Sequence, residues 1–308
     1  MLSVAWNPDG AKIALGTTRG VVLYDVKDGK ISGFNPLDKR ISPIAWSPDG
    51  SELAGVEQTH RTIFVWDIHG QLLGNLVDAP GYIWSMAWSP RSNLLATGEW
   101  RKATIWNTKT FQKIRDISTD DRDVMGLAWN PDGQRLAMTF NMGDGDEIWD
   151  VAVGKKIIDL KSDRAIGSLA WNPDGTKLIT GGGDSLDATA DCQTCVTWNP
   201  QIWSFDGTLL SELQGHSDLI VVTKWSPDGK YILTGSRDGE FIIWDAISSK
   251  RVDTFTLFPN SFNLLVMENS VDWSPDGHYL AFATDTGHLG IRDVARKKMI
   301  IDLDLETF

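Results

Sequence analysis

The residues best suited to metal or redox chemistry gather in one stretch of this chain, 181–195. Cys192 and Cys195 have the Cys-x-x-Cys spacing that can hold one edge of a zinc site or form a redox disulfide. A structural zinc ion needs four ligands, and the chain has no second pair of cysteines. Acidic residues here and in 141–146 could bind calcium, but neither stretch has the spacing of a known calcium loop. We expect a loop with two incidental thiols, and neither a metal nor a cofactor.

The sequence patterns of the common catalytic sites are missing. The chain has no Gly-x-Ser-x-Gly, no His-Glu-x-x-His, no phosphate loop ending in Gly-Lys-Ser/Thr and no Gly-x-Gly-x-x-Gly after a strand. Its five histidines are scattered along the sequence. We therefore predict that the protein is not an enzyme.

Four residues between positions 82 and 101 have the side-chain types that dominate binding hot spots, namely Tyr82, Trp84, Trp100 and Arg101. Trp100 lies between two charged residues, which indicates an exposed position. Trp84 has an alternative interpretation, because it could continue the buried face of the strand that ends at Trp88. We predict that these four residues contact a protein or peptide partner.

Arginines recur at the predicted loops of the chain. They are Arg19, Arg40, Arg61, Arg101, Arg122, Arg164 and Arg237. Guanidinium groups grip anions bidentately, so this set favours an anionic peptide or phosphopeptide as the partner. The alternative is that these arginines pair with the more numerous aspartates of the same loops. We include Arg122, Arg164 and Arg237 with Arg101 among the predicted partner-binding residues.

The segment 257–267 is too apolar for an ordinary exposed loop. An exposed apolar segment usually marks an interface, and Phe262 is its most prominent candidate contact. The alternative is a cap folded over the middle of the molecule or over the junction between its ends. Phe262 completes the predicted partner-binding set.

The candidate residues described above lie within a sequence repeat, which must determine their positions. Trp followed by Ser or Asn and Pro-Asp-Gly recurs at Trp6, Trp46, Trp88, Trp129, Trp171, Trp225 and Trp273, with a degenerate third copy. The steps between these tryptophans are 40, 42, 41, 42, 54 and 48 residues, so the period is about 41 with two insertions. The chain is therefore built of seven units.

Each unit has the pattern of four antiparallel strands. Residues before the Trp alternate in size with a period of two, and Pro-Asp-Gly then makes a hairpin turn. Helical patterns are nearly absent, and a radial arrangement of such sheets buries both faces of each. The prediction is an all-β, seven-bladed β-propeller in a single domain. Its expected blades are 1–34, 35–76, 77–117, 118–161, 162–213, 214–256 and 257–308.

The unit resembles the Trp-Asp (WD) repeat family across essentially the whole chain. The best-formed copy contains Gly215-His216, Trp225-Ser226-Pro227-Asp228-Gly229, Gly235-Ser236-Arg237-Asp238-Gly239 and Ile243-Trp244-Asp245. By this resemblance His216, Ser236, Asp238 and Trp244 form a hydrogen-bonded tetrad, which we interpret as structural. The other units depart from the pattern, and the last one ends in Ile291-Arg292-Asp293.

The ends of the chain predict an unusual ring closure. WD propellers commonly complete the last blade with an outer strand from the start of the chain, but residues 1–6 already form the innermost strand of blade one. We expect blade seven to be completed by its own final strand, around 298–303, and the ring to close by side-chain packing. The alternative is an upstream domain before Met1.

Charge and composition indicate which kinds of partner and which cellular compartment to expect. The 308 residues carry 41 acidic and 29 basic side chains, a net charge of −12 that disfavours nucleic acid. No signal peptide or long apolar run indicates a membrane, and two cysteines are typical of a reducing cytoplasm. We predict a cytoplasmic scaffold that binds a protein or peptide on its loop-rich face; the oligomeric state stays open. The alternative is a regulatory propeller attached to an enzyme or NTPase domain outside this sequence.

Overall fold

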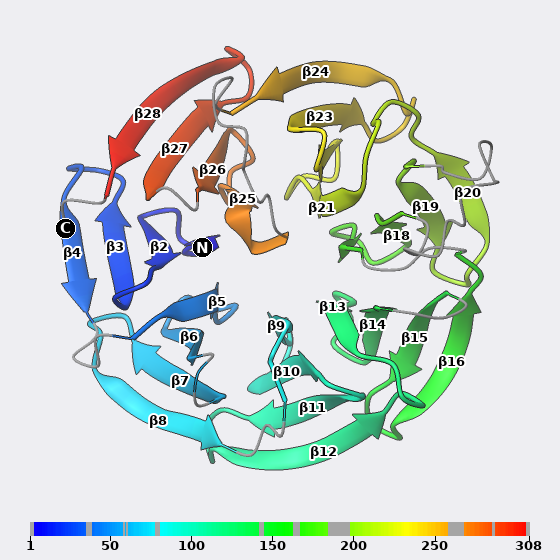
Figure 1. Ribbon diagram of the computed structural model, residues 1–308, viewed down its shortest axis with the longest axis horizontal. Helices are drawn as coiled ribbons and strands as arrows, with labels where there is room; N and C mark the ends of the chain where they lie inside the picture. Colours follow the sequence, from blue (N-terminus) through cyan, green and yellow to red (C-terminus); the bar gives the residue numbers. More distant parts are fainter. Residues whose placement is uncertain are drawn as a thin grey trace.

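The computed structural model is a ring of seven four-stranded antiparallel sheets, which confirms the predicted fold (Figure 1). It describes residues 3–34, 39–57, 59, 61–77, 81–141, 145–162, 167–183, 198–257, 268–284 and 287–305. Within these ranges the only helical element is the 3-10 turn η1 (Glu268–Ser270). No helix in the described part of the chain is long and apolar enough to cross a membrane.

Every blade is a meander of four strands that are consecutive in the sequence. Blade one contains β1 (Ser3–Trp6), β2 (Lys12–Gly16), β3 (Val21–Asp25) and β4 (Ile31–Phe34). Blade two contains β5 (Ile41–Trp46), β6 (Glu52–Glu57), β7 (Thr62–Asp67) and β8 (Leu72–Val77). Blade three contains β9 (Ser85–Trp88), β10 (Leu94–Glu99), β11 (Lys102–Asn107) and β12 (Gln112–Ser118). Blade four contains β13 (Val124–Trp129), β14 (Arg135–Phe140), β15 (Asp146–Asp150) and β16 (Lys155–Leu160).

The remaining three blades follow the same plan. Blade five contains β17 (Leu169–Trp171), β18 (Lys177–Thr180), β19 (Gln201–Ser204) and β20 (Leu209–Glu212). Blade six contains β21 (Ile220–Trp225), β22 (Tyr231–Ser236), β23 (Glu240–Asp245) and β24 (Arg251–Thr256). Blade seven contains β25 (Val271–Trp273), β26 (Tyr279–Ala283), β27 (His288–Asp293) and β28 (Lys298–Asp304). In each blade the first strand lies nearest the centre of the ring and the fourth lies at the rim (Figure 1).

The Pro-Asp-Gly turns join the first and second strands, as predicted. In six blades the turn glycine has φ between +70° and +75°, a region that favours glycine. Its N–H donates to the carbonyl of the residue after the Trp at 2.8–2.9 Å. Blade three has Ser92 at this position, and Ser92 is not among the residues with positive φ. The turn of blade three therefore differs from the other six.

The repeated tryptophans connect neighbouring blades. The indole Nε1 of Trp46 donates to the carbonyl of Ala5 in the preceding blade, at 3.2 Å. Trp88, Trp129, Trp171 and Trp225 make the same bond to Ala45, Ala87, Ala128 and Ala170, at 3.0–3.2 Å. The indole Nε1 atoms of Trp6 and Trp273 are buried and have no partner among the described residues. The hydrogen bond from the repeated tryptophan to the preceding blade is thus missing, within the described residues, on both sides of blade seven.

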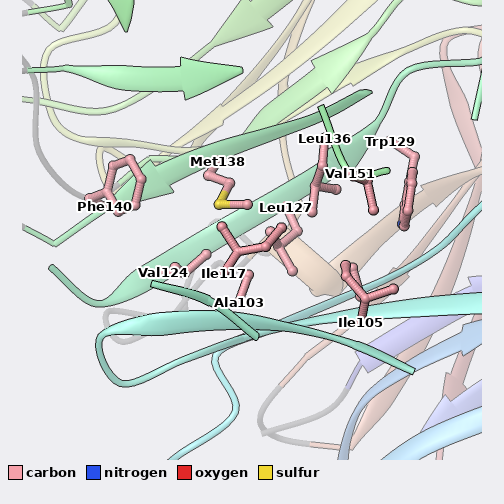
Figure 2. Close-up of a cluster of buried hydrophobic side chains, with 11 residues drawn as sticks. Ala103, Ile105, Ile117, Val124, Leu127, Trp129, Leu136, Met138, Phe140 and Val151 are labelled. Carbon is pink, nitrogen blue, oxygen red and sulfur yellow. The ribbon is translucent and has the colours of Figure 1, made fainter. Parts of the chain in front are cut away.

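Hydrophobic side chains fill the space between adjacent blades. Between blades three and four, Ile105 and Ile117 of one sheet pack with Leu127, Trp129 and Met138 of the next (Figure 2). All five of these side chains are buried. The strands of one blade alone could not cover these faces, so the ring depends on stacking of its neighbours.

The ring closes without a shared strand, as predicted from the order of the elements. The rim strand β28 pairs with β27 of its own blade. A buried cluster joins Val4 and Leu15 of blade one to Leu289 and Ile291 of blade seven. The backbone N–H of Trp6 also donates to the carboxylate of Asp272 at 2.9 Å. Packing and one carboxylate contact join blades one and seven.

Candidate protein-contact surface on blades two and three

Exposed aromatic side chains lie where blade three begins and where its middle strands turn. Tyr82 and Trp84 lie between β8 and β9, and Trp100 lies in the two-residue turn between β10 and β11. Their exposed fractions are 56%, 44% and 58%. In an antiparallel meander these two connections lie at the same end of the blade. The three aromatic residues therefore share one face of the ring, opposite the Pro-Asp-Gly turns.

Contacts between neighbouring residues bring these aromatic side chains and two arginines together. The segment that carries Tyr82 packs against Trp100, because a Cβ atom on Gly81 would lie 2.7 Å from Trp100 Cβ. The Arg61 guanidinium carbon lies 5.9 Å from the ring centre of Tyr82, and the rings of Tyr82 and Trp84 are 5.6 Å apart. The Arg101 guanidinium carbon lies 5.9 Å from the ring of Trp100. Arg101 also forms an ion pair with Asp121. We call Arg61, Tyr82, Trp84, Trp100 and Arg101 the blade-three surface.

The backbone beneath this surface has an uncommon conformation. Arg61 has φ +56° and Arg101 has φ +62°, and each directly precedes the third strand of its blade. The matching position is glycine in four other blades, at Gly20, Gly145, Gly239 and Gly287, all with positive φ. Non-glycine residues in this region cost stability, and such positions cluster at functional sites.

The exposure of Trp84 excludes one of its two interpretations, a buried position in the strand. Trp84 is 44% exposed, so it does not continue the buried face of Trp88. It lies four residues before Trp88, as Met125 and Val221 lie before their own tryptophans. Met125 and Val221 are the extra residues of β-bulges in β13 and β21. Trp84 is thus an exposed residue at the end of an inner strand.

Arg122 has its partners inside blade four. Its Nη2 donates to Glu147 Oε1 at 2.5 Å, and its guanidinium carbon lies 3.9 Å from the ring centre of Phe140. Its side chain is only 20% exposed. Burial alone would raise the pKa of Glu147, but hydrogen bonds from Arg122 and Lys156 lower it. Arg122 therefore stabilises blade four and is not part of the blade-three surface.

The other predicted contacts do not join this surface. Arg237 is exposed in the turn between β22 and β23 of blade six, three blades away from blade three. Arg164, Phe262, Cys192 and Cys195 lie outside the described residues. The same is true of 258–267, which is most of the apolar segment. In the described part of the chain, no group of three or more His, Cys, Asp or Glu could hold a metal ion.

A buried carboxyl group belongs to Glu99, which directly precedes Trp100 in the chain. Glu99 is 0% exposed and accepts a hydrogen bond from Thr97 Oγ1 at 2.7 Å. Lys102 Nζ lies 3.6 Å from its second oxygen. Burial raises the pKa of Glu99. Sequence reasoning missed this group, since a glutamate beside a predicted loop suggests an exposed position.

The hydrogen-bonded tetrad of blade six exists, but with a different hydroxyl group. His216 Nδ1 lies 3.2 Å from Asp238 Oδ2 and Nε2 lies 2.8 Å from Thr234 Oγ1, while Trp244 Nε1 donates to the same Thr234 oxygen at 2.8 Å. Ser236, which we predicted at this place, donates instead to Asp218 O at 2.9 Å. Residues 234 and 236 share one face of β22, so alternation alone could not choose between them. The correct member is Thr234.

Comparisons with known proteins agree with the architecture. The family described as "WD domain, G-beta repeat" matches residues 207–245, and the "Anaphase-promoting complex subunit 4 WD40 domain" matches residues 86–201. Protein FIZZY-RELATED 3 of Arabidopsis thaliana is 23% identical, over 82% of this chain and 51% of its own length. B-type cell cycle switch protein ccs52A of Medicago truncatula is 28% identical, over 81% of this chain and 51% of its own length.

A further relative and a solved structure complete the comparison. "Cell division cycle 20.1, cofactor of APC complex" of Arabidopsis thaliana is 26% identical over 67% of this chain and 39% of its own length. The chain spans about half the length, or less, of these curated relatives. A structure of Kuenenia stuttgartiensis hydrazine synthase has a TM-score of 0.77 at 16% identity, covering 99% of this chain and 95% of that one, a likeness of fold alone. The repeats, the seven-bladed ring and these matches show that the chain is a seven-bladed β-propeller with WD repeats.

Proposed function

We propose that this propeller is a protein-interaction scaffold that holds a protein or peptide partner on the blade-three surface and acts by binding, without catalysis. The observation that carries the proposal is the set of exposed side chains at Tyr82, Trp84, Trp100 and Arg101, with the half-buried Arg61 beside Tyr82. Tyr, Trp and Arg are the residues enriched in binding hot spots. The blades hold their loops rigidly, so binding loses little conformational entropy.

The backbone conformation supports the same assignment. Arg61 and Arg101 keep φ values of +56° and +62° where four other blades have glycine. A side chain is thus present at two positions where glycine would relieve the strain. This is the pattern expected when the side chain itself is needed for contact.

The relatives support binding of a protein partner. One relative is named as a cofactor of the APC complex, and "Anaphase-promoting complex subunit cdc20" of Dictyostelium discoideum is 29% identical over 58% of this chain. We propose that this chain likewise contacts a protein assembly, in the cytoplasm, with no nucleic acid or membrane as ligand. Its net charge of −12 opposes binding to a polyanion.

The aromatic side chains, more than the arginines, carry the proposed contact. Arg101 is paired with Asp121, and Arg122 is paired with Glu147. An anionic peptide would have to displace Asp121 before it could reach the Arg101 guanidinium. We therefore propose Arg101 as a hydrogen-bond donor at the edge of the contact, with Trp84 and Trp100 at its centre.

A pull-down from cell lysate tests the proposal. The parent chain is compared with a triple variant carrying Trp84→Ala, Trp100→Ala and Arg101→Ala, after both are shown to fold. The control triple variant carries Leu73→Ala, Val153→Ala and Ile247→Ala, which removes exposed apolar side chains elsewhere. We expect a partner held by the parent and the control and lost by the first variant. A partner held equally by all three would refute the blade-three surface.

A second candidate function is a regulatory propeller of a larger protein. The chain spans about half the length of the curated relatives it matches, which favours testing this possibility. The pull-down addresses it as well. If all three proteins retain nothing, the partner of the propeller is a domain of the same polypeptide.

A further inference from the structure

The rim strand of blade one differs from the rim strands of the other blades. The fourth strand of each blade lies at the rim, so one of its two edges has no neighbouring strand in its own sheet (Figure 1). In β4 every residue pairs in register with β3, from Tyr24 opposite Ile31 to Val21 opposite Phe34. A regular free edge can pair with the backbone of another chain, and folded proteins usually protect such edges. An unprotected rim strand is therefore a candidate contact site.

The other six rim strands carry a β-bulge. The register between the third and fourth strands shifts by one residue in each of blades two to seven, so one residue of the rim strand has no partner opposite. This extra residue is aliphatic and 38–56% exposed in all six blades. These residues are Leu73, Ile114, Ile157, Leu210, Val252 and Ile300. A bulge interrupts the regular spacing of the outward N–H and C=O groups, so it hinders pairing with a further strand.

Side chains from the next blade also cover two of these bulged strands. The Lys297 ammonium group, in the hairpin of blade seven, donates to the Val252 carbonyl of β24 at 2.7 Å. The ring of Phe111, in the hairpin of blade three, lies against β8, because a Cβ atom on Gly74 would lie 2.6 Å from its Cε1 atom. On β4, by contrast, a Cβ atom on Gly33 would meet one described atom within 4 Å, a carbonyl oxygen of β3 at 3.9 Å. The space beside Gly33 is open.

The hydrogen bonds of the β3–β4 hairpin determine which backbone groups of β4 face outward. The N–H of Asp25 donates to the Lys30 carbonyl at 2.8 Å, so these two residues form a hydrogen-bonded pair. Bonded and non-bonded pairs alternate along an antiparallel ladder, so Ser32 also bonds to β3, whereas Ile31 and Gly33 direct their N–H and C=O groups away from it. None of these four outward groups has a hydrogen bond to a described residue. β4 thus presents two donors and two acceptors with the spacing of a regular strand.

The side chains of β4 leave room for a further strand. Ser32 and Gly33 are small and exposed, and residues 31–34 include no charged side chain. In the adjacent hairpin, Lys30 pairs with Asp28 at 2.6 Å, and Lys27 is exposed outside the strand. Among the rim strands, β4 alone lacks both a bulge and a charged residue. An uncharged strand would therefore meet no opposing charge along this edge.

We propose that β4 binds an uncharged, extended strand of a partner protein, which adds to the sheet of blade one as a fifth strand. Its backbone exchanges hydrogen bonds with Ile31 and Gly33. The open space beside Gly33 favours a large apolar residue opposite this glycine, because such side chains pack well over a glycine in a neighbouring strand. A second copy of this chain is disfavoured, since two molecules of net charge −12 repel each other. The site is independent of the blade-three surface, because it lies on the rim of blade one.

The probe is the peptide acetyl-Thr-Val-Thr-Phe-Thr-Val-Thr-amide, which is uncharged and has a central aromatic residue. The control peptide carries N-methyl groups on Phe and on the Thr after it, so it lacks one donor on each edge. Binding to the full chain is followed by NMR at the backbone N–H signals of Ile31 and Gly33. We expect saturable downfield shifts at millimolar concentrations of the probe and about tenfold weaker binding of the control peptide. Equal binding of the two peptides, or no shift with either, would overturn the proposal.

Two substitutions of Gly33 locate the pairing. Gly33→Pro removes one outward donor and leaves the bonds to β3 in place, because proline is tolerated where the N–H of an edge strand faces solvent. It is expected to weaken binding of the probe about tenfold. Gly33→Ala keeps the donor, adds a Cβ atom at an ordinary contact distance and should bind the probe almost as the parent does. Undiminished binding to Gly33→Pro contradicts the site.

An insertion tests the role of the regular register. A valine inserted between Ile31 and Ser32 gives β4 the bulge of the other six rim strands and should abolish binding of the probe. Unchanged indole Nε1–H signals of the repeated tryptophans show that each variant folds; if one does not, the two peptides in the parent chain decide. Undiminished binding to the insertion variant contradicts the proposal. Shifts of the Ile31 and Gly33 signals with protein concentration alone would identify a second copy as the occupant and overturn the partner strand.

Discussion

Thr234 organises the polar network of blade six. The Trp244 indole can only donate, and the Asp238 carboxylate, with a pKa of about 2, only accepts. Burial alone would raise the pKa of Asp238, but hydrogen bonds from His216 and from backbone N–H groups outweigh it. Trp244 therefore donates to Thr234 Oγ1, while His216 bridges Thr234 and Asp238 through its two ring nitrogens. Thr234 is the residue that connects the indole of the strand to the histidine and the turn.

Replacing the Thr234 hydroxyl tests this network. Thr234→Val keeps the shape of the side chain but leaves the buried Trp244 N–H without an acceptor, so we expect a loss of about 2 kcal/mol in the free energy of unfolding. Ser236→Ala serves as the comparison. The Trp244 Nε1–H signal in NMR should shift strongly in Thr234→Val and little in Ser236→Ala. A larger shift in Ser236→Ala would instead support Ser236 as the hydroxyl group of the tetrad.

Glu99, next to Trp100 in the chain, makes the stability of the protein depend on pH. Burial raises its pKa above the ordinary value of 4.5, so the folded protein holds this proton more tightly than the unfolded chain does. The stabilisation is complete below the unfolded pKa and is lost as pH rises through the folded pKa.

The uncharged variant Glu99→Gln should therefore gain stability relative to the parent as the pH rises. Thermal unfolding at several pH values between 4 and 7 measures this difference in Tm. We expect similar Tm values at the acidic end and a higher Tm for Glu99→Gln at pH 7. A difference in Tm that stays constant with pH would show that Glu99 ionises normally.

At the scale of single elements, the turns combine a local and a non-local constraint. Gly50 has φ +70° and also touches Asn7 of the neighbouring blade, whereas Gly239 has φ +86° and nothing within 4 Å of a built Cβ atom. The first turn needs glycine for conformation and for space. The second needs it for conformation alone.

Alanine substitutions separate these two requirements. Gly239→Ala is expected to cost about 1 kcal/mol from backbone strain alone. Gly50→Ala adds a clash with Asn7 and should cost about 1–2 kcal/mol more. Urea unfolding of both variants measures the difference. Equal destabilisation would mean that the contact with Asn7 adjusts without cost.

The elements show where sequence reasoning succeeds. The period of two and the Pro-Asp-Gly turns are local signals, so the strands and their order could be predicted. The degenerate turn at Ser92 could also be predicted from the sequence. The cavity of about 190 Å³ beside this turn could not, because it depends on packing between two blades. The positive φ values of Arg61 and Arg101 could not be predicted from the local sequence either, because positive φ is typical of glycine and not of arginine.

At the scale of the whole molecule, blade seven is the place where the ring closes. It lacks a shared strand, and the indole bonds of Trp6 and Trp273 are not made within the described residues. Asp272 accepts from the Trp6 backbone N–H at 2.9 Å and from Lys224 Nζ at 3.4 Å. A single carboxylate thus contacts both neighbouring blades.

Removing this carboxylate should loosen the closure selectively. Asp272→Ala places the residue common to five other blades at this position and is expected to cost about 1–2 kcal/mol. Hydrogen exchange should accelerate most in β1 and β25–β28. Lys224→Ala keeps the bond to Trp6 and should cost less than about 1 kcal/mol. Uniform acceleration around the ring would contradict a localised closure.

The closure and the contact surface differ in how far the sequence predicts them. The order of the strands already implied that blade seven is completed by its own chain. The blade-three surface could be predicted only in part, because exposure decides it: Tyr82, Trp84, Trp100 and Arg101 are exposed, whereas Arg122 turns inward to Glu147. Charge alone could not distinguish an arginine that stabilises a blade from one that faces a partner.

Site-specific photo-crosslinking tests the central claim most directly. A photoreactive amino acid is placed at Trp100, on the blade-three surface, and separately at Ile247, which is 92% exposed on another blade. We predict that the probe at position 100 forms a crosslink to one protein partner, that unlabelled parent chain competes for it, and that the probe at 247 does not. A crosslink to the same partner from position 247 but none from position 100 would contradict the proposed surface.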